Sequence, residues 1–467
     1  MPDTHRDMPL NSATRAADSP TQDESALFTD LYELTMLAAY AREGMTEDAV
    51  FSLFVRRLPP VRNYIIACGL DTVLAYLENI HFTADEIAYL RSLGKFTEQF
   101  LASLAEFRFT GEVWAVPEGT PLFANEPILE IIAPLPQAQL AETWIMNQVH
   151  LQTMLASKAS RVVSAAAGRP VVDFGCRRMH GIDAGLKGAR AFHIAGVSAT
   201  SNVLAGQRYH LKVTGTMAHS YIQSHEDEYE AFRAFAGLYP DTVLLVDTYD
   251  TLNGVRKVVE LSQELGDRFH VRAVRLDSGD LVTLSKESRR ILDDAGLHRV
   301  EIFASGGLDE YTVADLLASG APIDGFGVGT SMGVSSDAAS LDIAYKLSEY
   351  AGEGRLKLAP GKSVLPGRKQ VFRREADGEY AGDTIARYGE RLPGRPLLEP
   401  VMRDGKRLSR ATSDLDAIRD YAQEQMVHLP IRLRQIAEAV PPYAVEVSDA
   451  LSRYQLEITK EVESSNG

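Results

Sequence analysis

The sequence predicts an α/β protein: an irregular (β/α) barrel with a second, smaller α+β or β-sandwich domain built from the N- and C-terminal segments. Short apolar runs begin at residues 243, 271, 302 and 323, at spacings of 28, 31 and 21 residues, and helical stretches separate them. This rhythm is typical of βα units in a parallel sheet, either closed or doubly wound. A closed barrel is the preferred interpretation, because phosphate commonly binds after the last two strands of a barrel.

The segment before the barrel mixes helices and short strands. Helical periodicity occurs at Phe28–Arg42, Leu70–Leu77 and Leu140–Ala167. Strand patterns occur at Phe51–Val55 and, with several turns, across residues 109–132. We therefore expect a small β unit and a long helix ahead of the barrel.

The segment after the barrel is more charged and is expected to pack on the N-terminal β unit. Strands are predicted at Lys369–Arg373 and Tyr380–Ile385, and the last helix around Ser413–Arg434. The predicted organisation is a flexible tail at 1–24, an N-terminal α+β domain at 25–168, a catalytic barrel at 169–345 and a C-terminal segment at 346–467.

Composition narrows the class of partner. The 467 residues carry a formal net charge of −16, which argues against nucleic acid or an anionic membrane, since both select basic surfaces. Two cysteines, Cys68 and Cys176, are too few for a disulfide framework and fit a reducing cytoplasm. No apolar run approaches the roughly 20 residues that cross a bilayer. We expect a cytoplasmic protein.

Two glycine turns follow consecutive apolar runs of the predicted barrel. They are Gly306-Gly307 and Gly329-Thr330. Glycines let backbone N–H groups close on a phosphate, Thr330 adds a hydroxyl, and the following helix adds its dipole. One such pair also marks an ordinary βα turn, but two at consecutive strand ends favour a phosphate site.

An aromatic residue and a basic cluster follow another strand end, at Asp173-Phe174-Gly175. The cluster contains Arg177, Arg178, His180, Lys187 and Arg190. Phe174 and Arg177 suit a flat anionic ligand, because the ring stacks and the guanidinium donates two hydrogen bonds. The alternative is a solvated helix face.

Arg275 and Asp277 point to the same side of a further strand, because side chains alternate with period two. Such a pair is costly on an apolar strand unless it is paired or used. A structural ion pair is the alternative; the carboxyl end of a strand favours function.

The segment Gly215–Ser220 places His219 in a turn of small residues, with a hydroxyl at Thr216. Histidine changes charge near neutral pH and can be a nucleophile. Taken alone, the segment is also compatible with a polar surface loop. The acidic run at 226–228 is left without an assigned role.

Together these segments resemble the nicotinate phosphoribosyltransferase family, in order, from Phe28 to about Tyr345. The six motifs that carry the resemblance are Thr29–Met36, Phe54–Pro59, Phe174–Arg178, Gly215–Ser220, Arg275–Asp280 and Gly327–Thr330.

The resemblance implies an enzyme that transfers phosphoribose from phosphoribosyl pyrophosphate to nicotinate. The products are nicotinate mononucleotide and pyrophosphate, and ATP hydrolysis is coupled to the transfer. The resemblance also implies a homodimer with active sites shared between subunits, and Mg²⁺ that travels with the pyrophosphate.

The resemblance assigns roles to individual residues. Tyr32 of the partner subunit and Phe174 stack on the two faces of the pyridine ring, and Arg275 binds the nicotinate with Thr216 beside it. His219 is phosphorylated by ATP.

Other roles concern phosphoribosyl pyrophosphate. Thr330 and the glycines before it bind the phosphoribosyl phosphate. Asp277 is expected to stabilise the positive charge that develops at the ribose carbon. Arg56, Arg177 and Lys346 are the candidates that bind the leaving pyrophosphate.

One difference from the related nicotinamide enzymes concerns the base. They carry an aspartate in the segment that here contains Ser198, and an aspartate would accept the amide N–H₂ and repel a carboxylate. We therefore expect nicotinate to be preferred over nicotinamide. Alternatives that stay open are a quinolinate or nicotinamide phosphoribosyltransferase, or a barrel that binds a phosphorylated metabolite without catalysis.

Overall fold

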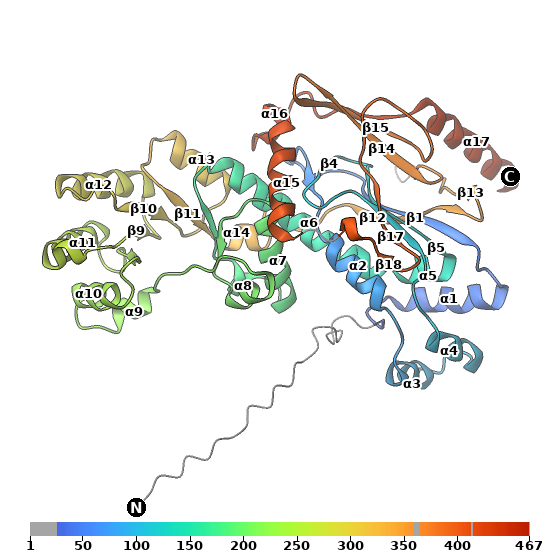
Figure 1. Cartoon of the computed structure of the whole chain (residues 1–467), viewed down its shortest axis with the longest axis horizontal. Helices are drawn as coiled ribbons and strands as arrows, with labels where there is room; N and C mark the ends of the chain where they lie inside the picture. The colour runs from blue at the N-terminus through green and yellow to red at the C-terminus, as the bar shows by residue number, and fades with distance from the viewer. Residues whose placement is uncertain (1–25, 359–363, 412–413, 467) are drawn as a thin grey trace, which may run out of the picture.

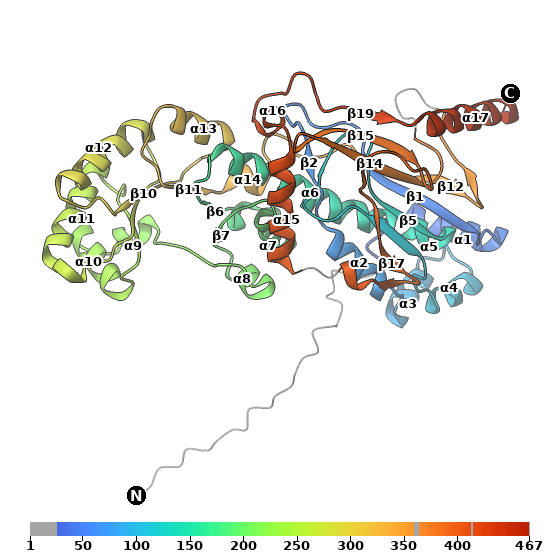
Figure 2. The ribbon, with the colours of Figure 1, turned by 45° about the horizontal axis from the view of Figure 1, so that its top comes forward.

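The computed structural model describes residues 26–358, 364–411 and 414–466; the predicted tail at 1–24 lies outside them. Two large sheets occupy opposite halves of the molecule, and helix α6 (Glu142–Ala165) runs between them (Figure 1). Helix α6 contacts α7 and α13 of one half and strand β12 of the other. The rotated view in Figure 2 shows the same two halves.

The first half contains a six-stranded sheet with the order β7-β6-β11-β10-β9-β8. Every neighbouring pair is parallel. The strands are β6 (Val171–Asp173), β7 (Ala199–Thr200), β8 (Val243–Leu245), β9 (Ala273–Leu276), β10 (Glu301–Ala304) and β11 (Gly325–Val328). The order ends at β7 and β8, so the predicted irregular barrel is an open half-barrel.

Helices follow the strands of the half-barrel. They are α7 (Ile182–Ile194), α8 (Val203–Tyr209), α9 (His219–Gln223), α10 (Glu228–Leu238), α11 (Thr251–Leu265), α12 (Leu281–Asp294), α13 (Glu310–Ala318) and α14 (Thr330–Gly333). Asp250, Asp280 and Asp309 begin α11, α12 and α13, and each side chain accepts a backbone N–H of the first turn. These caps explain why the chain turns into a helix soon after each strand.

The second half is built from both ends of the chain. Its seven-stranded sheet has the order β13-β12-β1-β5-β3-β17-β18 and is antiparallel throughout. The strands are β1 (Asp48–Val55), β3 (Glu112–Ala115), β5 (Pro127–Pro134), β12 (Ile343–Tyr350), β13 (Glu353–Gly354), β17 (Glu399–Arg403) and β18 (Lys406–Arg407). The expected packing of the C-terminal segment on the N-terminal β unit is therefore a shared sheet.

Two smaller sheets and the remaining helices complete this half. The smaller sheets contain β2 (Ile65–Ile66) with β4 (Pro121–Leu122), and β14 (Lys369–Ala376), β15 (Glu379–Arg387), β16 (Arg395–Pro396) and β19 (Val445–Val447). The helices are α1 (Leu31–Glu43), α2 (Leu70–Asn79), α3 (Ala84–Ser92), α4 (Glu98–Ala105), α5 (Leu135–Leu140), α15 (Leu415–His428), α16 (Ile431–Arg434) and α17 (Asp449–Asn466). Across the described residues, no helix combines the length and the apolar content that crossing a membrane requires.

A buried ion pair joins two of these sheets. Lys369 on β14 lies 3.2 Å from the carboxylate of Glu130 on β5, and the Lys369 backbone N–H donates to the same carboxylate at 3.0 Å. The Ser52 hydroxyl of β1 donates to it at 2.8 Å. Because both charged groups are buried, each depends on the other.

The prediction for the last helix is wrong. The segment around 413–434 contains two helices, α15 and α16, because Pro430 cannot continue the first one and instead begins the second. Ser413 itself lies outside the described residues. The last helix is α17, which the sequence interpretation did not include.

Candidate active site

The carboxyl ends of β6 and β9 bring an aromatic ring and a guanidinium together. Phe174 directly follows β6, and its N–H donates to Val328 O of β11 at 2.9 Å. The Arg275 guanidinium carbon, on β9, lies 6.0 Å from the centre of the Phe174 ring. Gly327 makes room for this ring, because a Cβ there would lie 2.5 Å from it. A ring and a guanidinium in this arrangement suit a flat anion, which can stack on the ring and accept hydrogen bonds from the guanidinium.

Arg275 is held by three different segments. Its Nη1 donates to Asp277 Oδ1 at 3.1 Å and to Ser305 Oγ at 3.2 Å, and its Nη2 donates to Met217 O at 2.7 Å. The Thr216 hydroxyl donates to the same Met217 carbonyl at 3.1 Å. Burial lowers the pKa of Arg275, and the nearby Asp277 opposes that shift. The predicted proximity of Thr216 and Arg275 is therefore present in the fold.

His219 and Asp277 face each other. His219 Nε2 lies 3.8 Å from Asp277 Oδ2, and the histidine side chain is 40% exposed. On the other side of the ring, Nδ1 lies 3.1 Å from the Thr248 hydroxyl. Ser305 Oγ donates to Asp277 Oδ1 at 2.5 Å. Thr248 and Ser305 were missed, although both lie at the ends of runs that the sequence had marked as strands.

A second carboxylate lies behind Asp277. Asp247 Oδ2 accepts the Asp277 backbone N–H at 2.9 Å and the Ser278 hydroxyl at 2.7 Å. Asp247 Oδ1 is buried and has no hydrogen-bond partner within the described ranges. Asp247 also ends a predicted strand, so the same signal would have identified it.

The two glycine turns lie at the same edge. Gly306 and Gly307 have φ of 88° and 66°, which glycine adopts readily. A Cβ on Gly306 would lie 1.8 Å from Asp277 O, so only glycine allows this close approach. Gly306, Gly307 and Thr330 are exposed, and Thr330 begins α14. Backbone donors and a hydroxyl are thus open to a ligand beside Asp277.

Three predicted residues lie in the other half of the chain. Tyr32 is on α1 and 48% exposed, Lys346 Nζ pairs with Glu142 at 3.5 Å, and Arg56 pairs with Asp342 at 3.4 Å. Figure 1 shows α1 beside the seven-stranded sheet, in the half of the molecule that lies away from β9 and β10. Within the described residues, no hydrogen bond or ion pair joins any of the three to Phe174, Arg275 or the other residues of the half-barrel edge. A single chain therefore does not assemble the whole predicted set.

The placement of Ser198 is a correction. Ser198 precedes β7, and its N–H donates to Val171 O at the start of β6, so it lies at the amino end of the sheet. The carboxyl end of β7 carries Ser201, whose N–H donates to Asp173 O at 2.9 Å, next to Phe174. Three residues of strand span about 10 Å. Ser201, rather than Ser198, lies at the edge where the site forms.

The basic cluster divides into two groups. Arg177 and Arg178 form a short 3₁₀ turn after Phe174 and are exposed, as expected of residues that meet an anion. Arg190 is buried and donates to both oxygens of Glu118, at 2.8 and 2.7 Å, so its role is structural. Lys187 pairs with Asp183 at 2.7 Å.

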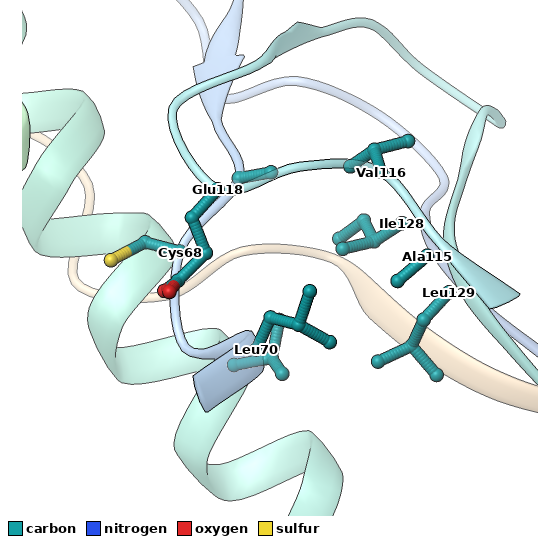
Figure 3. Close-up of a pocket in the computed structure, with 9 residues that line it drawn as sticks. Cys68, Leu70, Ala115, Val116, Glu118, Ile128 and Leu129 are labelled. Carbon is teal, nitrogen blue, oxygen red and sulfur yellow. The ribbon is translucent and has the colours of Figure 1, made fainter. Parts of the chain in front are cut away.

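Cys68 lies beside the Arg190–Glu118 pair and lines a cavity with Glu118 and Leu129 (Figure 3). The cavity measures about 10 Å³, which is near the lower limit of the space that one water molecule needs. Burial raises the pKa of the Cys68 thiol, and Glu118 adds to the shift. Cys68 is therefore a packing residue.

The acidic run at 226–228 forms the start of a helix. Asp227 accepts the Tyr229 N–H at 3.0 Å and caps α10. Glu228 is buried and pairs with Lys257 at 3.4 Å. Neither carboxylate contacts His219 in the described part of the chain.

An open parallel half-barrel with glycine turns, a nearly buried arginine and a partly exposed histidine at its carboxyl edge is typical of α/β proteins that bind small ligands at the strand ends. Three family profiles match successive parts of this chain. They are the N-terminal domain of nicotinate phosphoribosyltransferase at residues 27–150, the nicotinate phosphoribosyltransferase family at 170–375, and the corresponding C-terminal domain at 392–455.

Similar proteins extend over most of the chain. A nicotinate phosphoribosyltransferase of Mycobacterium tuberculosis is 56% identical over 430 residues, which is 92% of this chain and 93% of that protein. One from Bacillus subtilis is 42% identical over 380 residues, 79% of this chain and 78% of that protein. The crystal structure of human nicotinic acid phosphoribosyltransferase superposes with a TM-score of 0.81 at 26% identity, covering 92% of this chain and 99% of the human one. The chain belongs to the nicotinate phosphoribosyltransferase family, which confirms the resemblance.

Next to Tyr32, α1 buries a carboxyl group. Glu33 is fully buried; one carboxylate oxygen accepts Gln139 Nε2 at 2.7 Å, and the other has no hydrogen-bond partner among the described residues. Burial raises the pKa of Glu33 from 4.5 to about 7; the Gln139 hydrogen bond opposes this shift and the charge of Glu142 adds to it.

Glu33→Gln is expected to stabilise the protein at pH 8 more than at pH 5. A carboxyl group whose pKa is raised by folding destabilises the folded state increasingly as the pH rises from 4.5 to about 7. The full cost is on the order of 3 kcal/mol. Thermal unfolding at both pH values measures it, with Glu43→Gln at the exposed end of the same helix as control. Equal gains at the two pH values would contradict this account.

Proposed function

We propose that this chain catalyses the transfer of phosphoribose from phosphoribosyl pyrophosphate to nicotinate, giving nicotinate mononucleotide and pyrophosphate in the salvage of NAD. Family membership supports the reaction. The single observation that carries the assignment of the site is the Arg275–Phe174 pair, which lies beside Asp277 and both glycine turns. In this assignment the pyridine nitrogen forms a bond to the ribose carbon as the bond to pyrophosphate breaks.

Each part of the edge has a role in this proposal. The Arg275 guanidinium, which is already oriented by Met217 O and Asp277, binds the nicotinate carboxylate, and Phe174 stacks on the ring. Asp277 stabilises the positive charge that develops at the ribose carbon. Gly306, Gly307, Gly329 and Thr330 hold the phosphate of the sugar. Arg177 is the exposed cation beside the base that is available to the leaving pyrophosphate.

His219 is proposed to accept a phosphoryl group from ATP. Thr248 occupies Nδ1, so Nε2 is the nitrogen open to attack the γ-phosphorus, with ADP as the leaving group. Water later attacks the phosphohistidine and releases phosphate. Phosphorylation adds about 1.5 to 2 negative charges beside the half-barrel edge, which changes the affinity of this edge for anionic substrates.

The residues at the edge fit Mg²⁺. The ion prefers oxygen ligands, and Asp277 is partly exposed while Asp247 Oδ1 is a buried carboxylate oxygen that lacks a partner within the described ranges. Asp277 and Asp247 would hold the ion when it arrives with the substrate. When bound, it neutralises charge on the pyrophosphate.

We propose a homodimer in which the partner subunit's edge is completed by Tyr32, Arg56 and Lys346. Support comes from their position in the half of the chain away from the half-barrel edge, and from an exposed apolar surface around Tyr32. Phe28, Leu31 and Tyr32 are 46%, 46% and 48% exposed. A cytoplasmic location is proposed from the two free cysteines.

Purified protein with nicotinate, phosphoribosyl pyrophosphate and Mg²⁺ is expected to form nicotinate mononucleotide, and ADP formation should accompany it when ATP is added. His219→Ala should abolish the coupled ADP formation, whereas His225→Ala, at a nearby histidine, should retain it. Chromatography of both products measures the outcome. ADP released in proportion to product by His219→Ala would contradict the phosphohistidine. Binding without product would favour a non-catalytic barrel, and turnover of quinolinate instead would favour that enzyme.

Mixed subunits test the shared site. Tyr32→Ala and Arg275→Ala should each be nearly inactive alone. After subunit exchange, about half of the dimers combine one chain of each kind and contain one intact site, so activity should recover to about a quarter of wild type. Continued inactivity of the mixture, with exchange verified by tagged subunits, would contradict a site that takes Tyr32 from one subunit and Arg275 from the other.

Selectivity for the base is expected to depend on Ser201. Wild-type protein should use nicotinate in strong preference to nicotinamide when the two bases compete. Ser201→Asp should shift this ratio toward nicotinamide, because the added carboxylate accepts the amide and repels nicotinate. Ser198→Asp, at the amino end of β7, is the matched control and should leave the ratio unchanged. A shift with the control alone would return the assignment to Ser198.

A further inference from the structure

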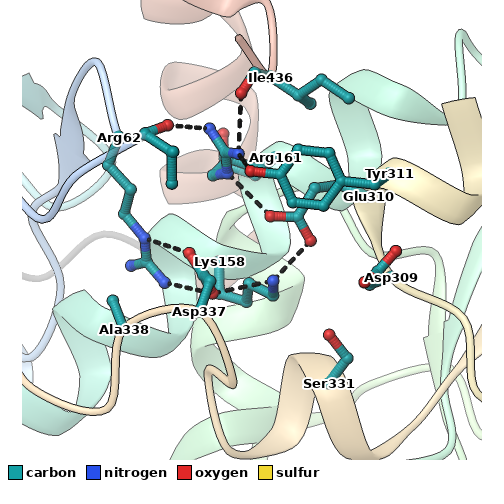
Figure 4. A network of polar contacts seen from close by, with 12 residues as sticks. Arg62, Lys158, Arg161, Asp309, Glu310, Tyr311, Ser331, Asp337, Ala338 and Ile436 are labelled. Carbon is teal, nitrogen blue, oxygen red and sulfur yellow. Dashed lines mark hydrogen bonds and ion pairs between the residues drawn. The ribbon is translucent and has the colours of Figure 1, made fainter. Parts of the chain in front are cut away.

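Five buried or nearly buried charged side chains form a network that includes the segments that follow the two glycine turns in the chain (Figure 4). It joins α6, the start of α13 and the segment that follows α14. The members are Arg62, Lys158, Arg161, Glu310 and Asp337. None of them belongs to the site described above.

Lys158 is the centre of this network. Its Nζ lies 2.5 Å from Glu310 Oε2 and 2.8 Å from Asp337 Oδ1, and its side chain is 1% exposed. Figure 4 shows the ammonium group between the two carboxylates. No other side chain in the described part of the molecule bonds to both of them.

Each carboxylate has a second cation. Arg161 Nε donates to Glu310 Oε1 at 2.9 Å, and Arg62 donates to the two oxygens of Asp337, at 3.1 Å each. Burial tends to raise the pKa of Asp337, but Arg62 and then Lys158 outweigh it and hold this pKa well below its usual range. Each side chain of the network therefore depends on its partners, because removing one would leave another without its hydrogen-bonded partner.

The two carboxylates lie on the segments that follow the two glycine turns. Glu310 is the first residue of α13 and follows Gly307 by three residues. Asp337 follows α14, and a compact set of hydrogen bonds ties its segment back to that helix. Ser336 N donates to Ser331 O at 3.1 Å, and the Ser331 and Ser336 hydroxyls lie 3.0 Å apart. Thr330 precedes Ser331 directly.

The chain of contacts thus runs from one glycine turn to the other through a single ammonium group. Gly306-Gly307 is continuous with Glu310, and Gly329-Thr330 is bonded to the segment of Asp337. The turns end the adjacent strands β10 and β11, and both are exposed at the edge of the sheet. Backbone donors that clamp one phosphorylated sugar must keep a fixed separation, because a shift of about 1 Å weakens such contacts severely.

We propose that Lys158 is a positioning residue that fixes the separation of the two glycine turns and thereby sets the affinity of the half-barrel for the phosphorylated sugar. The inference rests on the proposed function, in which these turns bind phosphoribosyl pyrophosphate. Lys158 does not touch the substrate; it acts through Glu310 and Asp337.

Lys158→Met removes the ammonium group and keeps most of the side-chain volume. It is expected to raise both the KM and the calorimetric Kd for phosphoribosyl pyrophosphate about tenfold, and to change the KM for nicotinate less than about twofold. Arg275 lies on β9 and Phe174 follows β6, so the base site is not expected to move. Steady-state kinetics and titration calorimetry on the full-length protein measure both substrates.

Lys369→Met is the matched control. Lys369 is also a buried lysine paired with a buried glutamate, Glu130, but it joins two sheets of the other half. It should lower the thermal unfolding midpoint to a similar extent while leaving the KM for phosphoribosyl pyrophosphate unchanged. If Lys158→Met does not fold, Asp337→Asn is expected to give the same selective rise, because it weakens the bond to Lys158 without changing volume.

The outcomes are distinct. An unchanged KM and Kd for phosphoribosyl pyrophosphate in Lys158→Met, or in Asp337→Asn where that variant is needed, overturns the proposal. Equal losses for both substrates, or the same loss in Lys369→Met, would show a general effect of stability and also overturn it. If the wild type forms no product, the proposed reaction fails, and the calorimetric Kd of the same variants still decides the role of Lys158.

Discussion

The edge of the half-barrel depends on one nearly buried guanidinium, that of Arg275. Its hydrogen bonds reach Met217 O in the loop before α9, Asp277 at the end of β9 and Ser305 at the end of β10. Removing it would take one donor from the partly exposed Asp277 carboxylate and one from Met217 O, and would leave them with the hydroxyls of Ser305 and Thr216 as donors. The same bonds orient the side chain before any ligand arrives, so little conformational entropy remains to be lost on binding. Stability and pre-organisation therefore come from the same contacts.

Glycine determines how closely the backbone segments approach at this edge. Gly306 lies so near the Asp277 carbonyl that no side chain is accommodated, and Gly327 leaves the space that the Phe174 ring occupies. The ring reaches Arg275 because β11, between β6 and β10, has no side chain at that position. The aromatic ring, the carboxylate and the glycine turns thus come together because glycine, which has no side chain, occupies the positions where these segments approach most closely. A glycine in the sequence indicates such a close approach only when the strands on either side of it are known.

Sequence patterns located the strand ends well because βα units repeat and each cap residue is local. They failed where a side chain pairs with a residue far away in the sequence, and where a shift of a few residues changes the end of the strand on which a residue lies. Arg190 looked like part of an anion site, but its partner Glu118 lies 72 residues away, and only the fold brings them together. Ser198 was placed at the edge because the limits of a two-residue strand are not visible in sequence; the hydrogen bonds of β7 put Ser201 there. Tyr32 could be named from the resemblance, and Lys346 as a cation for the leaving pyrophosphate. Their separation from Arg275 follows from a sheet that is shared by the two ends of the chain.

The distance between His219 and Asp277 gives a physical reason for the proposed dependence on ATP. Two unit charges about 4 Å apart interact by about 4 kcal/mol at the effective dielectric constant of a protein surface. A phosphoryl group on His219 would stand beside the Asp277 carboxylate and would repel it unless cations enter between them. Mg²⁺ arriving with pyrophosphate would supply such a cation, so the phosphorylated edge would favour the substrate complex over the empty site. Hydrolysis of the phosphohistidine would remove that preference and release the product. In this proposal the energy of ATP would be converted into a difference in affinity, which would act through charges that Arg275 holds in place.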